Sequence, residues 1–233
     1  ARTCEALALD HGLGREDLHG RVRETLATND LADAYVRLSV TRGVQPGKLT
    51  PDPEVDPTVV VRVAELPRGG VDGDPVWDGP ATVETSSVQR IPDAAIPAHA
   101  KTHNYLNGIL ARQSVDAEEA LLCDATGAVA EGATSNLCFV RDGRLHTPAL
   151  SGPVLPGITR AVVLDLADEA GVPVEEGTYD PDAVGRADEA FLTNTTWEVR
   201  PVASLDGTDI GAGPVTRRLS DALDALVERR HYG

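Results

Sequence analysis

The sequence predicts an α+β fold, in which helices and strands follow one another without strict alternation. The chain has 233 residues, of which 41% are hydrophobic, enough for the core of one large domain or two smaller ones. Apolar residues recur at helical spacing in a few segments and alternate with polar residues in several shorter ones. Because the short segments often follow each other directly, an irregular α/β arrangement is favoured over a doubly wound parallel sheet.

The individual elements follow from these two patterns in chain order. A first helix is expected at 15–29, where Asn29 and Asp30 end it. Strands are expected at 34–43, 58–66, 81–90, 120–123, 128–130, 135–140, 144–147, 189–192 and 198–202. Further helices are expected at 104–113, 157–171 and 215–229. The helix at 157–171 ends at Gly171 and carries an apolar stripe of Ile158, Val162, Leu164, Leu166 and Ala167.

Residues 67–80 predict a linker between two domains. They read P-R-G-G-V-D-G-D-P-V-W-D-G-P, which is dense in glycine, proline and aspartate and has no periodicity. We therefore expect the remainder of a small N-terminal α/β domain over 1–75 and a large C-terminal domain over 76–233. Because the sequence opens with A-R-T-C-E-A-L-A-L, like the middle of an amphipathic helix, we expect the first part of the small domain to precede Ala1.

The composition argues against several classes of function. A formal net charge of −16 disfavours nucleic-acid binding, which needs a basic surface. No apolar run approaches the roughly 18 residues of a membrane span. Three cysteines, Cys4, Cys123 and Cys138, show no C-x-x-C spacing and fit a reducing cytoplasm. His99 and His103 stand four residues apart, but no acidic or cysteine partner completes a metal site.

The acidic surface predicts a stability that depends on salt. Acidic residues are spread along the whole chain, and only two of the 21 basic residues, Lys48 and Lys101, are lysines, a composition that suggests a salt-loving cell. At about 1 M salt the Debye length is about 3 Å, so self-repulsion is screened. We expect the thermal midpoint to rise steeply from dilute buffer to molar KCl. An unchanged melting curve across that range would contradict this interpretation.

Lys101 stands in the segment A-K-T-H-N-Y-L-N-G, residues 100–108. A desolvated lysine can lose its proton and act as a nucleophile, which arginine cannot do. A pyridoxal phosphate site needs such a lysine, an acid for the pyridine nitrogen and a cradle for the phosphate. Glu131 in V-A-E-G-A-T-S-N-L offers the acid, and L-P-G-I-T-R at 155–160 opens a helix whose N-terminal amides suit an anion. Hydroxyl side chains within 191–202 can complete that cradle.

In this order the segments resemble the fold-type IV, or class IV, pyridoxal phosphate enzymes. These comprise branched-chain aminotransferases, D-amino acid aminotransferases and aminodeoxychorismate lyases. The matching motifs are K-T-H-N-Y-L, E-G-A-T-S-N-L, L-P-G-I-T-R and T-N-T-T-W-E-V-R-P-V, and the resemblance runs from Tyr35 to Gly233. It implies a two-domain fold, pyridoxal 5'-phosphate as the cofactor, amino acid and 2-oxo acid substrates, and a homodimer. The family's phosphate-binding arginine, in an H-x-x-R-L motif, would lie upstream of Ala1.

The resemblance implies a role for each cofactor-binding residue. Lys101 would form the aldimine with the cofactor and move the proton between the substrate carbon and the cofactor. Glu131 would pair with the pyridine nitrogen. Ile158 and Thr159 would donate backbone amides to the phosphate, and Thr159 and Thr195 would add hydroxyls.

Five further residues match family positions around the ring and the substrate. Arg90 matches the arginine that branched-chain enzymes place near the ring, and Tyr105 would line the cofactor pocket. The Thr196 amide would meet the substrate carboxylate. Tyr35 and Arg37, in Y-V-R, resemble the strand with which branched-chain enzymes contact that carboxylate.

The choice of reaction depends on the segments around these residues. Residues 44–49, V-Q-P-G-K-L, lack the R-x-H pair of the D-amino acid enzymes, so an aminotransferase with branched-chain-like substrates is the leading interpretation. Aminodeoxychorismate lyase, which forms p-aminobenzoate and pyruvate, stays a close alternative because Asn104 follows Lys101 by three residues, as in the lyases. A non-catalytic relative is the alternative from a different class.

Overall fold

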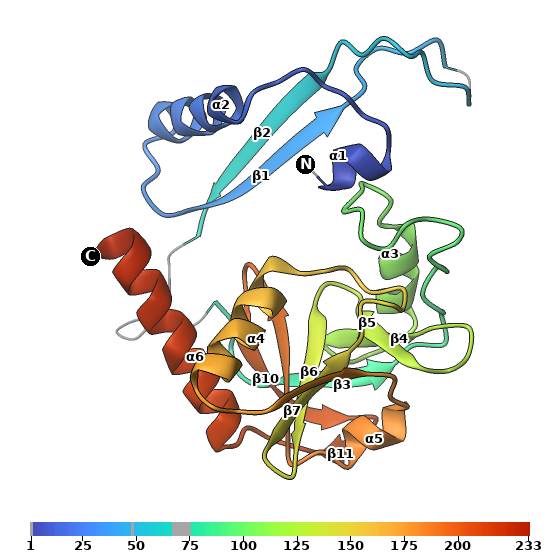
Figure 1. Ribbon diagram of the computed structural model, residues 1–233, viewed down its shortest axis with the longest axis vertical. Coiled ribbons are helices and arrows are strands. Elements are labelled where there is room, and N and C mark those ends of the chain that lie inside the picture. Colours follow the sequence, from blue (N-terminus) through green and yellow to red (C-terminus); the bar gives the residue numbers. More distant parts are fainter. Residues whose placement is uncertain (1, 48, 67–75) are drawn as a thin grey trace. The chain divides into compact units, whose positions relative to one another are not determined.

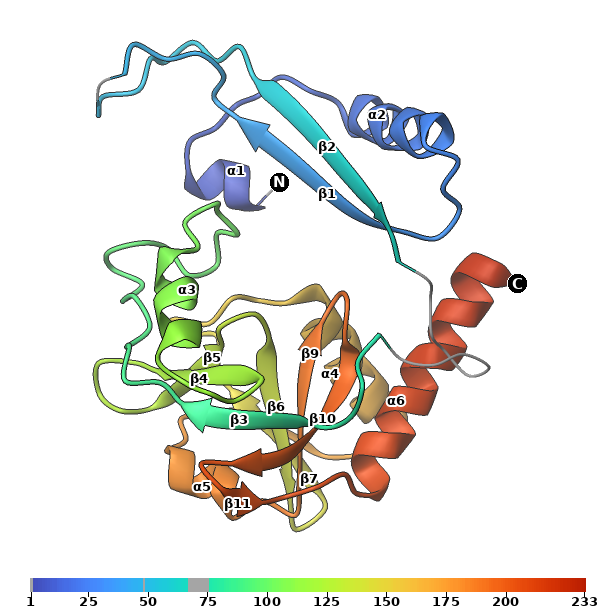
Figure 2. The same ribbon diagram turned by 180° about the vertical axis from the view of Figure 1, so that it is seen from behind.

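The computed structural model describes residues 2–47, 49–66 and 76–233 (Figures 1 and 2). The chain divides into two compact units, Ala1–Gly69 and Gly70–Gly233. Most of the predicted linker, residues 67–75, lies outside the described residues. Within the described ranges, no helix has both the length and the apolar character needed to cross a membrane.

The first unit is built on two antiparallel strands. Its elements are α1 (Arg2–Ala6), α2 (Arg15–Thr28), β1 (Ala34–Thr41) and β2 (Thr58–Glu65). β1 ends two residues earlier than predicted. There Gly43 has φ +73°, and an added Cβ would lie 1.8 Å from the Asp56 carbonyl oxygen. Only glycine allows the chain to turn away from β2 at this point.

The second unit contains one mixed sheet. Its strands are β3 (Ala81–Thr85), β4 (Glu119–Cys123), β5 (Val129–Gly132), β6 (Asn136–Arg141), β7 (Arg144–Pro148), β8 (Val174–Gly177), β9 (Glu189–Asn194), β10 (Glu198–Leu205) and β11 (Thr208–Asp209). The order is β5-β4-β3-β10-β9-β6-β7-β8, with β11 on β10. β3 is parallel to β4 and β10, β7 is parallel to β8, and the other pairs are antiparallel. The mixed order confirms the predicted α+β class.

Alternate residues of the strands fill two separate cores. Leu137 and Phe139 of β6 join one cluster with residues from β3, β4, β5, β9 and β10. Cys138 and Val140 join a second cluster, with α4 and α6. Because β5, at one end of the strand order, also contacts β6 and β7 near the other end, the sheet curls around this cluster. Successive residues of a strand point to opposite faces, so a single strand such as β6 contributes to both cores.

Helices cover the sheet on the side of the second cluster. α4 (Ile158–Glu169) and α6 (Pro214–Val227) lie side by side there, and a π-helix (Glu228–Tyr232) follows α6 (Figure 1). The predicted stripe on α4 is wrong in part. Ile158 is 70% exposed, and the buried face consists of Arg160, Val163, Leu166 and Ala167. The prediction of the buried face failed because an arginine is not counted among apolar residues, although the polar partners of Arg160 allow its side chain to be buried.

Two other helices lie elsewhere in this unit. α3 (Leu106–Gln113) follows the lysine segment and starts two residues later than predicted. α5 (Pro181–Gly185) was not predicted, and neither were β8 and β11. α5 has only five residues, and β8 reads V-E-E-G with both glutamates exposed, so neither carries a readable period.

Candidate active site

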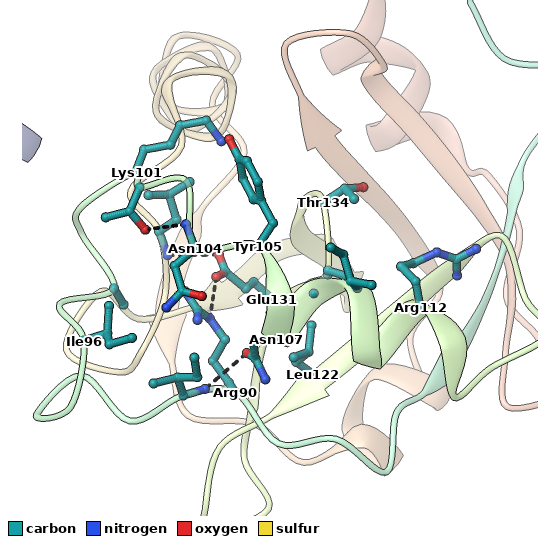
Figure 3. Close-up of a pocket in the computed structure, with 18 of the residues that line it drawn as sticks. Arg90, Ile96, Lys101, Asn104, Tyr105, Asn107, Arg112, Leu122, Glu131 and Thr134 are labelled. Atoms are coloured by element: carbon teal, nitrogen blue, oxygen red, sulfur yellow. Dashed lines mark hydrogen bonds and ion pairs between the residues drawn. The ribbon is translucent and has the colours of Figure 1, made fainter. Parts of the chain in front are cut away.

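A cavity of about 480 Å³ opens in the second unit beside Lys101 and Glu131 (Figure 3). Three parts of the chain line it: the loop between β3 and α3, the inner side of α3, and the turn after β5. Leu122 and Leu155 add apolar walls. The cavity thus gathers Arg90, Lys101, Tyr105 and Glu131, which the sequence predicted as cofactor-binding residues.

Glu131 is the fixed acid of this cavity. It is 7% exposed, on β5. Its Oε1 accepts a hydrogen bond from Arg90 Nε over 2.8 Å, and its Oε2 accepts from Leu155 N over 2.9 Å and Asn136 Nδ2 over 3.3 Å. Burial raises the pKa of the Glu131 carboxyl, whereas the charges of Arg90 and Lys101 act in the opposite direction. Donors from three segments therefore hold this carboxyl in one orientation.

Lys101 and Tyr105 come from the loop that enters α3. Ala98 N donates to Asp93 Oδ1 over 2.7 Å, and Asn104 N donates to Thr102 Oγ1 over 3.3 Å, so local polar contacts shape the loop. The Lys101 side chain is exposed at the cavity wall, and Tyr105 is 43% exposed just before the first residue of α3. Both side chains are accessible to a ligand in the cavity.

The N-terminus of α4 offers the predicted anion cradle. Its N-cap residue, Gly157, has no side chain that could cap the helix, and the first turn of α4 carries no acidic residue. A Cβ on Gly157 would lie 2.0 Å from Asn136 Oδ1, so the chain can pass here only as glycine. The first amides, at Ile158 and Thr159, lie at the positive end of a twelve-residue helix.

The turn between β9 and β10 holds the two predicted threonines. Thr195 is exposed. The Thr196 amide already donates to Asn194 Oδ1 over 2.9 Å, and Trp197 N donates to the same oxygen over 2.6 Å. The role of Thr196 toward a substrate carboxylate therefore stays a prediction that requires these bonds to exchange. Sequence reasoning missed Asn194, although an asparagine before two polar residues is a common turn former.

A second buried acid, Glu119, was also missed. It is 0% exposed on β4, and its Oε2 accepts from Thr134 N over 3.1 Å, Thr134 Oγ1 over 2.6 Å and Ser135 Oγ over 2.9 Å. Its Oε1 accepts from Ala120 N over 2.9 Å. Glu119 thus fixes the turn that follows Glu131. The signal was an acid at the start of the apolar strand E-A-L-L-C.

Arg160 anchors the first turn of α4 to the sheet. It is 3% exposed, and its Nη2 donates to Glu176 Oε2 over 2.6 Å and to Pro148 O over 3.0 Å, while Nε donates to Thr147 Oγ1 over 3.3 Å. The predicted phosphate cradle is therefore tied to β7 and β8.

We expect Arg160→Leu to weaken cofactor binding and to lower stability by about 2 kcal/mol, since charged hydrogen bonds are lost. Thermal melting and titration with pyridoxal phosphate measure both effects. Arg186→Leu is the control, because its contact with Asp182 is exposed and 3.9 Å long. Equal melting points and equal cofactor affinities for the two variants would contradict an anchoring role for Arg160.

Tyr35 and Arg37 lie in the first unit, on one face of β1. In the ladder with β2, Tyr35 pairs with Ala64 and Arg37 with Arg62. Val59 and Val61, on the other face of β2, line a hollow with residues of α2. The face with Tyr35 and Arg37 is therefore the one away from α2. Their contact with a substrate bound near Lys101 stays a prediction.

The groups of the second unit suit pyridoxal phosphate. Glu131 offers an oriented carboxyl for a ring nitrogen, Lys101 an amine for an aldehyde, and the uncapped start of α4 a site for a phosphate. Tyr105 lines the cavity, whereas Thr159, in the first turn of α4, and Thr195, in the turn after β9, do not.

Comparisons with known proteins agree with this arrangement. The family model described as amino-transferase class IV matches residues 1–205. A branched-chain-amino-acid aminotransferase of Pseudomonas aeruginosa is 36% identical over 220 residues, which are 91% of this chain and 70% of that protein. A D-alanine aminotransferase of Staphylococcus haemolyticus is 30% identical over 236 residues, 98% of this chain and 80% of that protein.

A solved structure gives the same result. The branched-chain amino acid aminotransferase of Thermobaculum terrenum, in its PLP-form, superposes with a TM-score of 0.89 at 28% identity, covering 99% of this chain and 76% of that one. These relatives are aminotransferases, so the lyase alternative is not favoured. The chain belongs to amino-transferase class IV and is one of this family's pyridoxal phosphate-dependent enzymes.

Proposed function

We propose that this chain transfers the amino group of a branched-chain amino acid to a 2-oxo acid. The observation that carries the proposal is the position of Glu131, held by three donors beside Lys101 in one cavity. The branched-chain names of the Pseudomonas and Thermobaculum relatives support the substrate class.

The roles of the residues around the cofactor follow from their chemistry. When bound, pyridoxal phosphate accepts the electron pair that remains when the substrate Cα loses its proton. Lys101 Nζ would take that proton as a general base and would deliver it to the cofactor as a general acid. Glu131 holds a proton at the ring nitrogen, and Arg90 keeps the Glu131 carboxylate oriented through its 2.8 Å contact.

The other predicted residues hold the two ends of the ligands. The amides of Ile158 and Thr159, with the hydroxyls of Thr159 and Thr195, bind the phosphate. Tyr105 lines the ring side of the cavity, from the loop that also carries Lys101. The Thr196 amide, in the turn after β9, binds the substrate carboxylate.

Arg37 and Tyr35, on β1 of the first unit, are the further residues proposed to recognise a carboxylate. Arg37 and Arg62 stand directly opposite each other on one face of β1 and β2, and among the described residues neither has an ion-pair partner. Two such arginines, facing each other without an acid between them, attract a carboxylate.

A D-amino acid substrate is the second candidate, because the D-alanine aminotransferase relative is 30% identical. The absence of arginine and histidine from residues 44–49 disfavours it. We also propose a cytoplasmic homodimer. The proposed cytoplasmic location is based on the three free cysteines, and the proposed dimer is based on the family resemblance alone.

An absorbance scan tests the reaction. The protein, reconstituted with pyridoxal phosphate in molar KCl, receives L-leucine, L-valine, D-alanine and aminodeoxychorismate in separate experiments. We expect leucine and valine to convert the cofactor to its pyridoxamine form. Conversion by D-alanine alone would move the chain to the second candidate, and release of pyruvate from aminodeoxychorismate alone would establish a lyase. No spectral change with any of the four would indicate a non-catalytic relative.

A further inference from the structure

We infer that Asn194 occupies the backbone amides that take the substrate carboxylate and has to release them before the substrate binds. This makes Asn194 a specificity-determining residue of the site. The inference rests on the proposed role of the Thr196 amide in carboxylate binding.

The turn after β9 presents two neighbouring N–H groups to a single side-chain oxygen. Thr196 N and Trp197 N donate to Asn194 Oδ1 over 2.9 and 2.6 Å. Consecutive amides that converge on one oxygen form the type of concave site in which backbone binds anions. Asn194 Oδ1 therefore fills the position that an anionic oxygen bound by these two amides would take.

The other end of the Asn194 side chain is held more weakly. Its Nδ2 donates to Thr134 O over 3.4 Å, which is long for an N–H···O hydrogen bond. Thr134 itself is held by Glu119 through its amide and its hydroxyl. The contact with the Thr134 carbonyl identifies the nitrogen of the Asn194 carboxamide, because only that atom can donate to a carbonyl oxygen. The Asn194 side chain can give up this long hydrogen bond with little loss of energy.

This arrangement sets a competition between a neutral and a charged acceptor. A carboxylate accepts stronger hydrogen bonds from amides than a carboxamide oxygen does, so the substrate can displace Asn194 Oδ1. The displacement lowers the apparent affinity, because only the fraction of molecules with free amides can bind. A ligand without a carboxylate cannot compete, and the turn stays closed to it.

Kinetics of the holoenzyme with L-leucine test the inference in two variants. Asn194→Ala removes the competing oxygen, so KM should fall about two- to tenfold while kcat changes little. Asn194→Asp keeps an acceptor for both amides and adds a negative charge that repels the substrate, so KM should rise more than about tenfold. Competitive inhibition by propionate, a carboxylate with no amino group, should tighten in the first variant and weaken in the second.

A matched control separates competition from simple support of a turn. Asp124 closes the β4–β5 hairpin in the same way, accepting from Thr126 N over 2.8 Å and Ala128 N over 3.1 Å. Neither Asp124 nor Asn194 lines the cavity itself, but Asn194 contacts the lining residue Thr134. Asp124→Ala should lower the melting temperature and leave KM unchanged. If Asn194 only supported its turn, Asn194→Ala would raise KM and Asn194→Asp would resemble the wild type, which would overturn the inference.

The two proposals fail in different ways. If the wild type does not react with leucine, the proposed function fails, whereas propionate still decides the role of Asn194. The affinity for propionate of the wild type and of both variants is then measured through the absorbance of the bound cofactor. It has to be highest in Asn194→Ala and lowest in Asn194→Asp. Any other order overturns the inference, and melting curves show that each variant is folded.

Discussion

Replacing Lys101 by arginine is expected to abolish amino transfer. Arginine stays protonated at every working pH, so it can neither attack an aldehyde nor take a proton from the substrate Cα. The loss of a positioned acid–base group alone predicts a fall in kcat of about 10²- to 10⁴-fold, and the loss of the nucleophile adds to it. Single-turnover absorbance with leucine measures the effect, since the change of the cofactor to its pyridoxamine form should no longer occur.

A matched control for this variant is Lys48→Arg, at the only other lysine of the chain. It should keep full activity, because the sequence assigns no chemistry to that position. For Lys101→Ala, an added small amine such as methylamine should restore part of the proton transfer. Transamination by Lys101→Arg at the wild-type rate would remove Lys101 from the mechanism.

Glu131→Gln should produce the second-largest loss. The amide cannot hold a proton at the ring nitrogen, and it leaves Arg90 without the carboxylate that it contacts over 2.8 Å. A hydrogen bond to a charged group is worth about 1.5–3 kcal/mol, so kcat should fall by about 10- to 150-fold. The measurement is the rate of the leucine half-reaction, with cofactor affinity determined separately.

Glu118→Gln is the control for that variant. Glu118 also contacts an arginine, Arg200, but its side chain is half exposed and it does not line the cavity. Its replacement should reduce stability without slowing the half-reaction. If Glu118→Gln slows the half-reaction as much as Glu131→Gln does, the predicted role of Glu131 is wrong.

The sequence predicted the strands whose two faces enter different cores, because their pattern is local. β6 and β9 read N-L-C-F-V-R and E-A-F-L-T-N, short apolar runs of the kind expected for strands that are buried on both faces. The apolar stripe on α4 failed because Arg160 is buried by partners 12 to 16 residues away along the chain. Propensity and periodicity hold no information about such partners.

The candidate site divides in the same way. Lys101, Glu131 and the start of α4 stand in short motifs, so sequence alone identified them. Asn194 and Glu119 act through contacts with Thr134 that span 60 and 15 residues, and no local pattern indicates them. Tyr35 and Arg37 lie in the first unit, so their contact with the substrate carboxylate stays a prediction.

Asn136 links the two ends of the proposed cofactor site. Its Nδ2 donates to Glu131 Oε2 and to Leu155 O, and its Oδ1 lies against the position where a Cβ of Gly157 would stand. The acid for the ring and the turn that leads to the phosphate cradle are therefore clamped to one side chain. A change that displaces Asn136 is therefore expected to disturb the Glu131 carboxyl and the start of α4 together, rather than one of them alone. A side chain at position 157 is expected to have the same effect, because its Cβ would lie 2.0 Å from Asn136 Oδ1.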